Sequence, residues 1–180
     1  MSKLTPAAGQ RILDTDRIRK ALLSKAGPAK WNDEDAYVRA DQAESIGNAL
    51  CEQVHRHLRT ERTGYLFKKK LGGRGEKITM AKASIVSPKL KFFAELDFLV
   101  DISWEVWMHL EPHQRVALID HELSHFGIDE TDKGEKVRVI FPHDVEEFDG
   151  IIRRWGFWKP DVANFAGAVR EQLELLGPKA

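Results

Sequence analysis

The chain has 180 residues, of which 42% are hydrophobic and 31% charged, and its 28 basic residues balance its 28 acidic ones. This length and composition predict a compact globular domain rather than a fibrous or disordered chain. The zero net charge excludes a global field that would draw the protein to nucleic acid or to a membrane surface. The single cysteine, Cys51, excludes an internal disulfide and a zinc ribbon built from cysteines.

The N-terminal segment, residues 1–13, is small and polar, and we expect it to be disordered and followed by a single domain over residues 14–180. The segment contains no apolar region of the kind found in signal peptides, and nowhere do 18 apolar residues follow one another. We therefore expect a cytoplasmic protein with no membrane partner.

Apolar residues at helical spacing predict two helices in the first third of the chain, over residues 14–25 and 41–58. Two strands are expected next, over residues 64–67 and 78–86, joined by the glycine-rich turn at residues 72–75. The second of these strands could expose an edge on which a peptide substrate binds as an added strand.

The basic residues around this turn have two interpretations. A local patch for nucleic acid is one, and the solvated tip of a hairpin is the other, which we favour because phosphate-binding proteins usually present a larger basic face. The sequence thus gives only weak support for DNA association through these residues: Lys68, Lys69, Lys70, Arg74 and Lys77.

Alternating apolar residues predict a third strand over residues 98–102, and Ser103 can cap a short helix that carries Trp104 and Trp107. A longer helix is expected over residues 112–126, with Pro112 in its first turn and Gly127 as its stop. One side of that helix is an apolar stripe made for burial, formed by Val116, Ile119, Leu123 and Phe126.

The same helix carries the pentapeptide His-Glu-Leu-Ser-His at residues 121–125, an HExxH motif. His121 and His125 are four residues apart, so they share one helix face, opposite the apolar stripe, and both imidazoles can bind one metal ion. A zinc ion with three protein ligands keeps its fourth position for a water molecule and lowers the pKa of that water to about 7. Glu122 can then act as the general base when the water attacks a peptide carbonyl.

A third ligand must come from elsewhere in the chain. We favour His143, because it follows Pro142 at the start of a second amphipathic segment from which its side chain can reach the first two histidines. Glu146 or Glu147 could be the ligand instead, although a solvated helix N-terminus also explains two carboxylates at that place. The apolar residues that predict this second helix are Val145, Phe148, Ile152 and Trp155.

Other polar residues have weaker claims to a role. Asp120 and Asp144 are candidates for acceptors that orient the imidazoles, by their proximity in the sequence alone. The candidates for a second group that stabilises the oxyanion are Tyr65, Arg138 and His113. Beyond the motifs, a weaker strand is expected over residues 137–141, and Asp161 should cap a last helix that extends to Leu176.

Several of these segments together resemble known zinc peptidases. The segments HELSHFG at 121–127, HDVEEF at 143–148 and RRWG at 153–156 are similar to the SprT-like zinc metallopeptidases, although Asp144 stands where that family usually has glycine. With Tyr65-Leu66-Phe67 and the strand at 97–102, the closer resemblance is to the putative phage metallopeptidase family, over roughly Gln53 to Trp158. The resemblance implies a zincin-like core, a three-histidine zinc site and, for a phage protein, the cytoplasm of the host cell.

These observations predict an α+β, zincin-like fold, in which a small mixed β-sheet packs on the HExxH-bearing helix between flanking N- and C-terminal helices. The expected function is that of a Zn²⁺-dependent metallopeptidase acting on proteins or peptides, with His121, His125 and His143 as ligands and Glu122 as catalytic base. The alternative is a zinc-stabilised, non-catalytic binding protein that acts on a host protein or in association with DNA. The presence of Glu122 argues against this alternative, because a purely structural site needs no general base.

Overall fold

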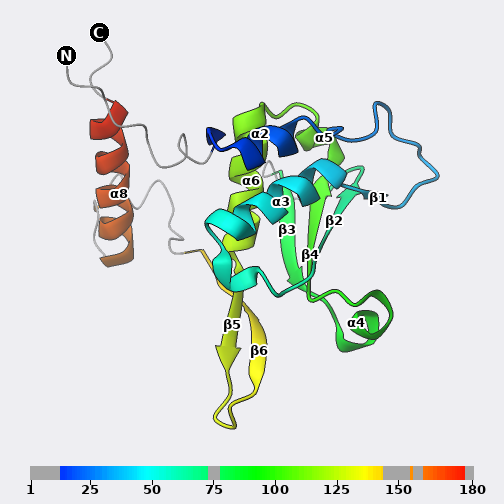
Figure 1. Ribbon diagram of the computed structural model, residues 1–180. Helices are drawn as coiled ribbons and strands as arrows, with labels where there is room; N and C mark the ends of the chain where they lie inside the picture. The colour runs from blue at the N-terminus through cyan, green and yellow to red at the C-terminus, as the bar shows by residue number, and fades with distance from the viewer. Residues whose placement is uncertain (1–12, 73–77, 144–154, 156–159, 177–180) are drawn as a thin grey trace. The chain divides into compact units, whose positions relative to one another are not determined.

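The computed structural model describes residues 13–72, 78–143, 155 and 160–176 (Figure 1). The chain divides into two compact units, one of residues 12–141 and one of residues 142–180 together with the first eleven. The expected disordered segment, residues 1–13, lies outside the described residues except for its last position. The single domain over residues 14–180 stays a prediction.

The larger unit contains a four-stranded mixed sheet (Figure 1). Its strands are β1 (Val38–Arg39), β2 (Thr63–Lys68), β3 (Ala81–Ile85) and β4 (Phe98–Ser103), in the order β1-β2-β4-β3. β2 and β4 run parallel, whereas β1 and β3 pair antiparallel to their neighbours. The α+β class and the small mixed sheet are therefore as predicted.

The expected hairpin between the strands near 64–67 and 78–86 is wrong, because β4 lies between β2 and β3. The reason lies in burial: Phe98, Val100 and Ile102 of β4 are fully buried, whereas the residues of β3 are only half-buried or exposed. The strand with the most apolar face takes a central place, and β3 is left at an edge of the sheet. The glycine-rich turn thus does not join neighbouring strands.

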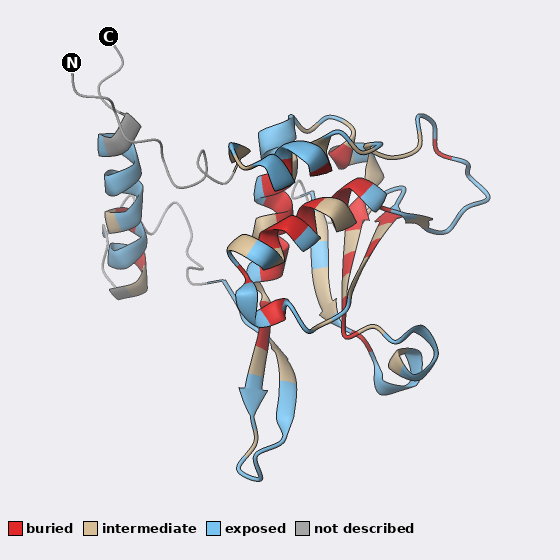
Figure 2. Ribbon diagram, viewed as in Figure 1, coloured by how far each residue is buried: buried red, intermediate tan, exposed pale blue. Residues whose placement is uncertain are grey.

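Helices α3 (Asp41–Gln53) and α6 (Pro112–Ser124) pack on this sheet, and α2 (Asp16–Leu22) lies against α3 (Figure 1). α3 contacts β2, α6 contacts β3, and α2 packs on α3. The buried positions alternate along the strands and recur along the helices, as Figure 2 shows. Each large apolar side chain in this core stabilises the fold by about 1.5–3 kcal/mol; examples are Phe67, Phe98, Ile46, Leu50, Ile119 and Leu123.

A second, two-stranded sheet follows α6 directly. It is a hairpin of β5 (Phe126–Glu130) and β6 (Lys136–Ile140), in the register Phe126 opposite Ile140. The predicted strand at 137–141 is confirmed with a shift of one residue, but the helix ends at Ser124 instead of Phe126. Phe126 leaves the helix to stack on Phe98, with ring centroids 4.2 Å apart, so Gly127 lies inside a strand and does not stop the helix.

Three short elements complete this unit: the 3-10 helix η1 (Arg56–Leu58), α4 (Pro88–Ala94) and α5 (Trp104–Trp107). The helix expected over residues 41–58 is therefore interrupted after Gln53, while the short helix after Ser103 is confirmed. The indole N–H groups of Trp104 and Trp107 donate to the backbone carbonyls of Pro28 and Ala26, at 3.0 and 2.7 Å. The two tryptophans thus fix the connection that follows α2.

The smaller unit contributes one described helix, α8 (Pro160–Leu176). This confirms the last predicted helix, but the helix begins at Pro160, so Asp161 lies inside its first turn and is not its cap. Val162 is buried, but Phe165 and Leu173 of the predicted apolar stripe are more than half exposed. The helix expected to follow Pro142 lies outside the described residues, except for Trp155. Over the part of the chain that is described, no helix has the length and apolarity needed to cross a membrane.

Candidate metal centre

The helix α6 places the two motif histidines on its outer face. Pro112 lies in its first turn, and the side chains of Glu111 and Gln114 cap its free N–H groups reciprocally. Val116, Ile119 and Leu123 are buried on the inner face, as the apolar stripe predicts. The imidazole centroids of His121 and His125 are 5.0 Å apart, which is the consequence of their four-residue spacing.

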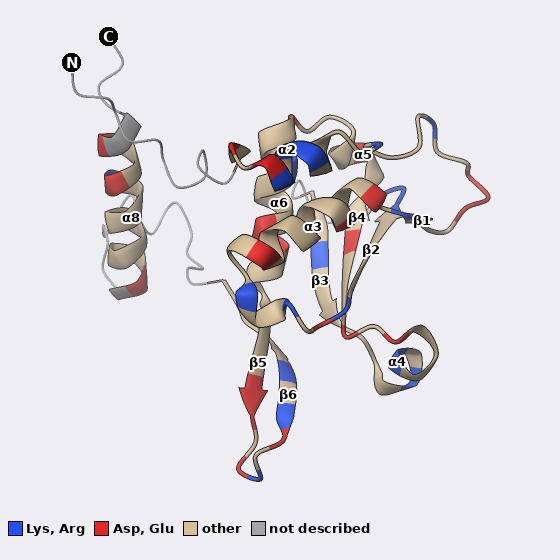
Figure 3. Cartoon of the chain, in the orientation of Figure 1, with Lys and Arg blue, Asp and Glu red and all other residues tan. Residues whose placement is uncertain are grey.

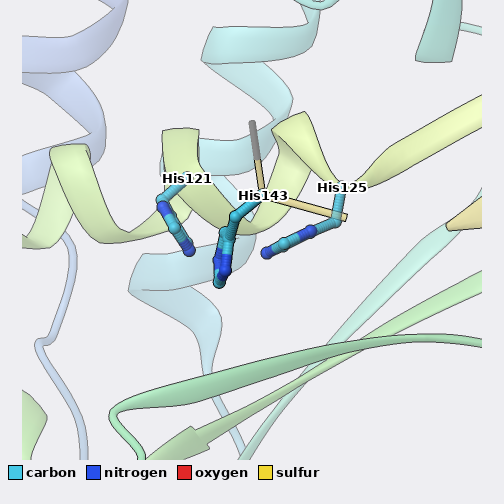
Figure 4. A group of neighbouring side chains, drawn as sticks. All are labelled: His121, His125 and His143. Carbon is cyan, nitrogen blue, oxygen red and sulfur yellow. The ribbon is translucent and has the colours of Figure 1, made fainter. Parts of the chain in front are cut away.

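His143 joins these two residues. Candidate ligand atoms of His121, His125 and His143 all lie within 4.8 Å of one another, and Figure 4 shows the three rings directed toward a common point. Three imidazoles form a donor set that suits zinc and other divalent transition metals. The residues present thus fit the metal that the motif implies. Glu146 and Glu147, the alternative ligands, lie outside the described residues.

The orientation of His125 is fixed by the end of the β5–β6 hairpin. Its Nδ1 atom lies 2.7 Å from the backbone carbonyl oxygen of Phe141. Because a carbonyl can only accept, Nδ1 carries the proton and Nε2 keeps its lone pair for a metal. The backbone N–H of Phe141 in turn donates to the carbonyl of His125 at 2.7 Å. His143 follows only two residues after Phe141.

Glu122 is almost completely buried, with 4% of its surface exposed. Burial raises the pKa of its carboxyl group above the ordinary value, while the electrostatic effect of His125 and a hydrogen bond from the backbone N–H of Ala83 act in the opposite direction. Ala83 belongs to the edge strand β3, so the carboxylate lies where α6 meets that edge. A carboxylate whose pKa is raised is a stronger proton acceptor, as a general base requires.

The two histidines that follow α3, one just before η1 and one within it, serve packing rather than ligation. His55, which is buried, lies with Nε2 2.6 Å from Oδ1 of Asp120. Nε2 of His57 donates to the carbonyl of Phe126 at 3.1 Å. The pair ties α3 and η1 to both ends of the motif segment. The expectation for Asp120 changes accordingly, because it accepts from a histidine outside the cluster; Asp144 lies outside the described residues.

The three candidates for a further electrophile lie at different places. Tyr65 is buried beneath α3, and burial raises the pKa of its hydroxyl far above its usual range. Arg138 is paired with Glu61 and Asp97. His113 is exposed in the first turn of α6, two turns before His121. The structure brings none of these three into the histidine cluster.

The basic residues near the glycine-rich turn are partly engaged locally. Lys69 pairs with Asp33, and the ammonium group of Lys68 lies 5.9 Å from the ring centroid of Tyr37. Arg74 and Lys77 lie outside the described residues. The described part of this segment is thus consistent with a solvated loop.

Two groups that shape the site were missed from the sequence, the carbonyl of Phe141 and the N–H of Ala83. Both are backbone groups, which every residue has, so the residue types at these positions do not predict their roles. The alternation of Val137, Val139 and Phe141 was the signal available for the first, because a strand returning along Phe126–Glu130 brings Phe141 opposite His125.

Comparison with known proteins gives a family for this chain. The sequence matches the family described as Putative phage metallopeptidase over residues 35–170, which is well over half of the chain. No curated protein and no solved structure shows significant similarity. The matched segment contains the HExxH helix, the β5–β6 hairpin and His143. On this match, the chain belongs to the putative phage metallopeptidase family.

Proposed function

We propose that this protein is a zinc-dependent peptidase with a zincin-like active site. His121, His125 and His143 hold the metal, and Glu122 is the catalytic base. The observation that carries the proposal is the convergence of three imidazoles, within 4.8 Å of one another, next to a buried carboxylate that is not one of them.

Zinc is the metal that this donor set favours. Catalytic zinc sites use three protein ligands and keep one position open, whereas structural zinc sites use four, mostly cysteines. When bound, zinc supplies Lewis acidity that polarises a peptide carbonyl and lowers the pKa of water to about 7. With one cysteine in the whole chain, Cys51 on α3, a cysteine-rich structural site is excluded.

Residues of the chain carry out the proton transfer and hold the reacting groups in position. The Glu122 carboxylate accepts the proton of the attacking water and passes it to the leaving amine. The N–H of Ala83 holds that carboxylate at the edge of the sheet, and the carbonyl of Phe141 holds the ring of His125. β3 is the last strand at one edge of the sheet, and Glu122 lies at this edge. An extended substrate can therefore pair with β3 as an added strand.

The buried carboxylate also favours catalysis over a zinc-stabilised binding protein. Burying Glu122 disfavours its charged form, so the carboxylate destabilises the fold, and a catalytic role explains why it is kept there. A site that served folding alone would gain from an apolar residue at this position, which lies among the buried residues of α6.

Glu122→Gln tests the proposal, with Glu105→Gln, an exposed glutamate on α5, as the matched control. The Gln side chain keeps its shape but cannot accept the proton, so the variant should bind one zinc per chain while hydrolysis of an unfolded protein falls about 100-fold or more. Equal cleavage by the wild type and Glu122→Gln would remove Glu122 from the mechanism. Zinc binding without cleavage by the wild type would favour the binding protein instead.

A further inference from the structure

Arg138, on β6, bridges two carboxylates. Its Nε atom lies 2.7 Å from Oε2 of Glu61, and one of its terminal nitrogens lies 2.7 Å from Oδ1 of Asp97. The side chain of Arg138 is 29% exposed, and those of Glu61 and Asp97 are 10% and 9% exposed. An arginine that binds two carboxylates through two of its nitrogens, largely shielded from solvent, holds its partners in a defined geometry. Solvent-exposed surface ion pairs, by contrast, contribute little to stability. Figure 3 shows basic residues on β6, the strand that carries Arg138.

The two partners of Arg138 belong to the central sheet. Glu61 lies just before β2, and Asp97 lies just before β4, at the start of the two parallel strands. Asp97 is itself fixed, because Oδ1 lies 2.5 Å from Nζ of Lys91 and Oδ2 accepts from the backbone N–H of Arg62 at 2.9 Å. Arg138 therefore connects β6 to a rigid part of the molecule.

β6 leads directly to the metal centre. Three residues after Arg138, Phe141 forms its two hydrogen bonds with His125. Two residues further lies His143, whose ligand atom joins those of His121 and His125. A strand advances only about 3.3 Å per residue. An anchor at Arg138 therefore closely restrains the position of the few residues that follow it.

We infer that Arg138 is a positioning residue of the metal centre. By tying β6 to the sheet through Glu61 and Asp97, it holds the strand end from which His143 reaches the metal. The inference rests on the proposed function, since it needs His143 to be a ligand. It also gives Arg138 a role other than oxyanion stabilisation, because its guanidinium is occupied by two carboxylates.

The test compares zinc affinity in full-length variants. Arg138→Gln removes both contacts, Arg138→Lys keeps the charge without the fork that reaches two carboxylates, and Lys136→Gln, an exposed position on the same strand, is the control. Zinc dissociation constants come from competition with a chelator. We expect a loss of about tenfold for Arg138→Gln, the scale for groups that orient metal ligands. Arg138→Lys should be intermediate, and Lys136→Gln should match the wild type.

A double-variant cycle separates positioning from general destabilisation. In a His143→Ala background, Arg138→Gln should reduce zinc affinity less than about threefold, because the ligand through which Arg138 acts is gone. Hydrogen exchange of the Phe141 amide, measured without zinc, should accelerate in Arg138→Gln while the amides of α3 stay protected. If Arg138→Gln does not fold, Glu61→Gln removes the charge of one of the two partners and should weaken zinc binding in the same direction.

Two results would overturn the inference and leave the proposed function standing. One is wild-type zinc affinity in Arg138→Gln while His143→Ala loses the metal. The other is an equal loss with and without His143, which would show that Arg138 acts on the fold in general. By contrast, undiminished zinc binding by both His121→Ala and His143→Ala would refute the metal site itself.

Discussion

His125 and Phe141 are joined by two hydrogen bonds, one from the backbone N–H of Phe141 to the carbonyl of His125 and one from Nδ1 of His125 to the carbonyl of Phe141, each 2.7 Å long. The first is a strand contact and the second orients a proposed metal ligand. The end of the β5–β6 hairpin is therefore part of the proposed metal centre, and changes in the hairpin should be measurable as changes in metal binding.

Gly127→Ala should disturb this hairpin. A Cβ atom at position 127 would lie 2.3 Å from Cε2 of the Phe141 ring and 2.8 Å from Cγ2 of Val139, so the ring must move. We expect a loss of about 1–3 kcal/mol in the free energy of unfolding, the range for overpacking, and weaker zinc binding. Denaturant unfolding and chelator competition measure the two effects. Gly72→Ala, where a Cβ meets nothing within 4 Å, is the control, and unchanged zinc affinity in Gly127→Ala would contradict the prediction.

His143→Ala should lose zinc as severely as His121→Ala does. The reason is that three imidazoles converge in the cluster, and the removal of any one leaves only two protein ligands. Metal analysis of the purified variants, with His113→Ala as an exposed histidine control on α6, provides the measurement. If His143→Ala keeps its zinc while Glu146→Ala or Glu147→Ala loses it, the third ligand has been assigned wrongly.

Asp97→Asn should alter how stability depends on pH. Burial alone would raise the pKa of Asp97, but the hydrogen bonds from Lys91 and Arg62 and the charges of Arg138 and Lys91 outweigh it and hold that pKa below its ordinary value. A group of this kind stabilises the fold above its unfolded pKa, about 3.9, and the stabilisation is lost as the pH falls through the lower, folded pKa.

Asp97→Asn should therefore be less stable than the wild type by roughly 2 kcal/mol near pH 7, on the scale of hydrogen bonds to charged groups. The difference should be constant down to about pH 5 and shrink below about pH 4, as the wild-type carboxyl group becomes protonated. Urea unfolding across this pH range tests the prediction. A difference that is the same at pH 3 and pH 7 would show that the charge of Asp97 does not stabilise the fold.

Gly47→Ala should destabilise the protein although it lies in the middle of α3. Alanine favours a helix over glycine by about 1 kcal/mol, but its Cβ would lie 2.0 Å from the hydroxyl oxygen of Tyr65. The helix must move away from β2, and we expect a net loss of about 1–2 kcal/mol in the free energy of unfolding. Gly167→Ala in α8, where a Cβ meets nothing within 4 Å, should show only the stabilisation that comes from the higher helix propensity of alanine. A Gly47→Ala variant more stable than the wild type would contradict the close approach.

The sequence was most informative where side chains repeat with the period of their element. Val116, Ile119 and Leu123 gave the orientation of α6, and with it the outward face of His121 and His125. The position of His143 after Pro142, at the start of a second amphipathic segment, favoured it over Glu146 and Glu147 as the partner, and the structure brings it to the first two histidines. These inferences need only local geometry and the coordination preferences of metals.

Local geometry could not predict which distant segments of the chain pair with one another. The glycine-rich turn after β2 favoured a hairpin, but the competition of β4 for the central position depends on the whole core. The end of α6 was misplaced because Phe126 stacks on Phe98, a residue from another strand. Ala83 and Phe141 act through backbone atoms, which all residues share.

The strand order also determines when the parts of the site can form. β3 has no partner in the sheet until β4 is available, and β2 pairs with β4 only after a long loop is closed, since Thr63 lies opposite Phe98. Closing such loops reduces chain entropy before any contact compensates for it, so this step should limit the folding rate. The β5–β6 hairpin can close locally within microseconds. The segment that carries His143 can thus be in place before the sheet that packs against Glu122 is complete.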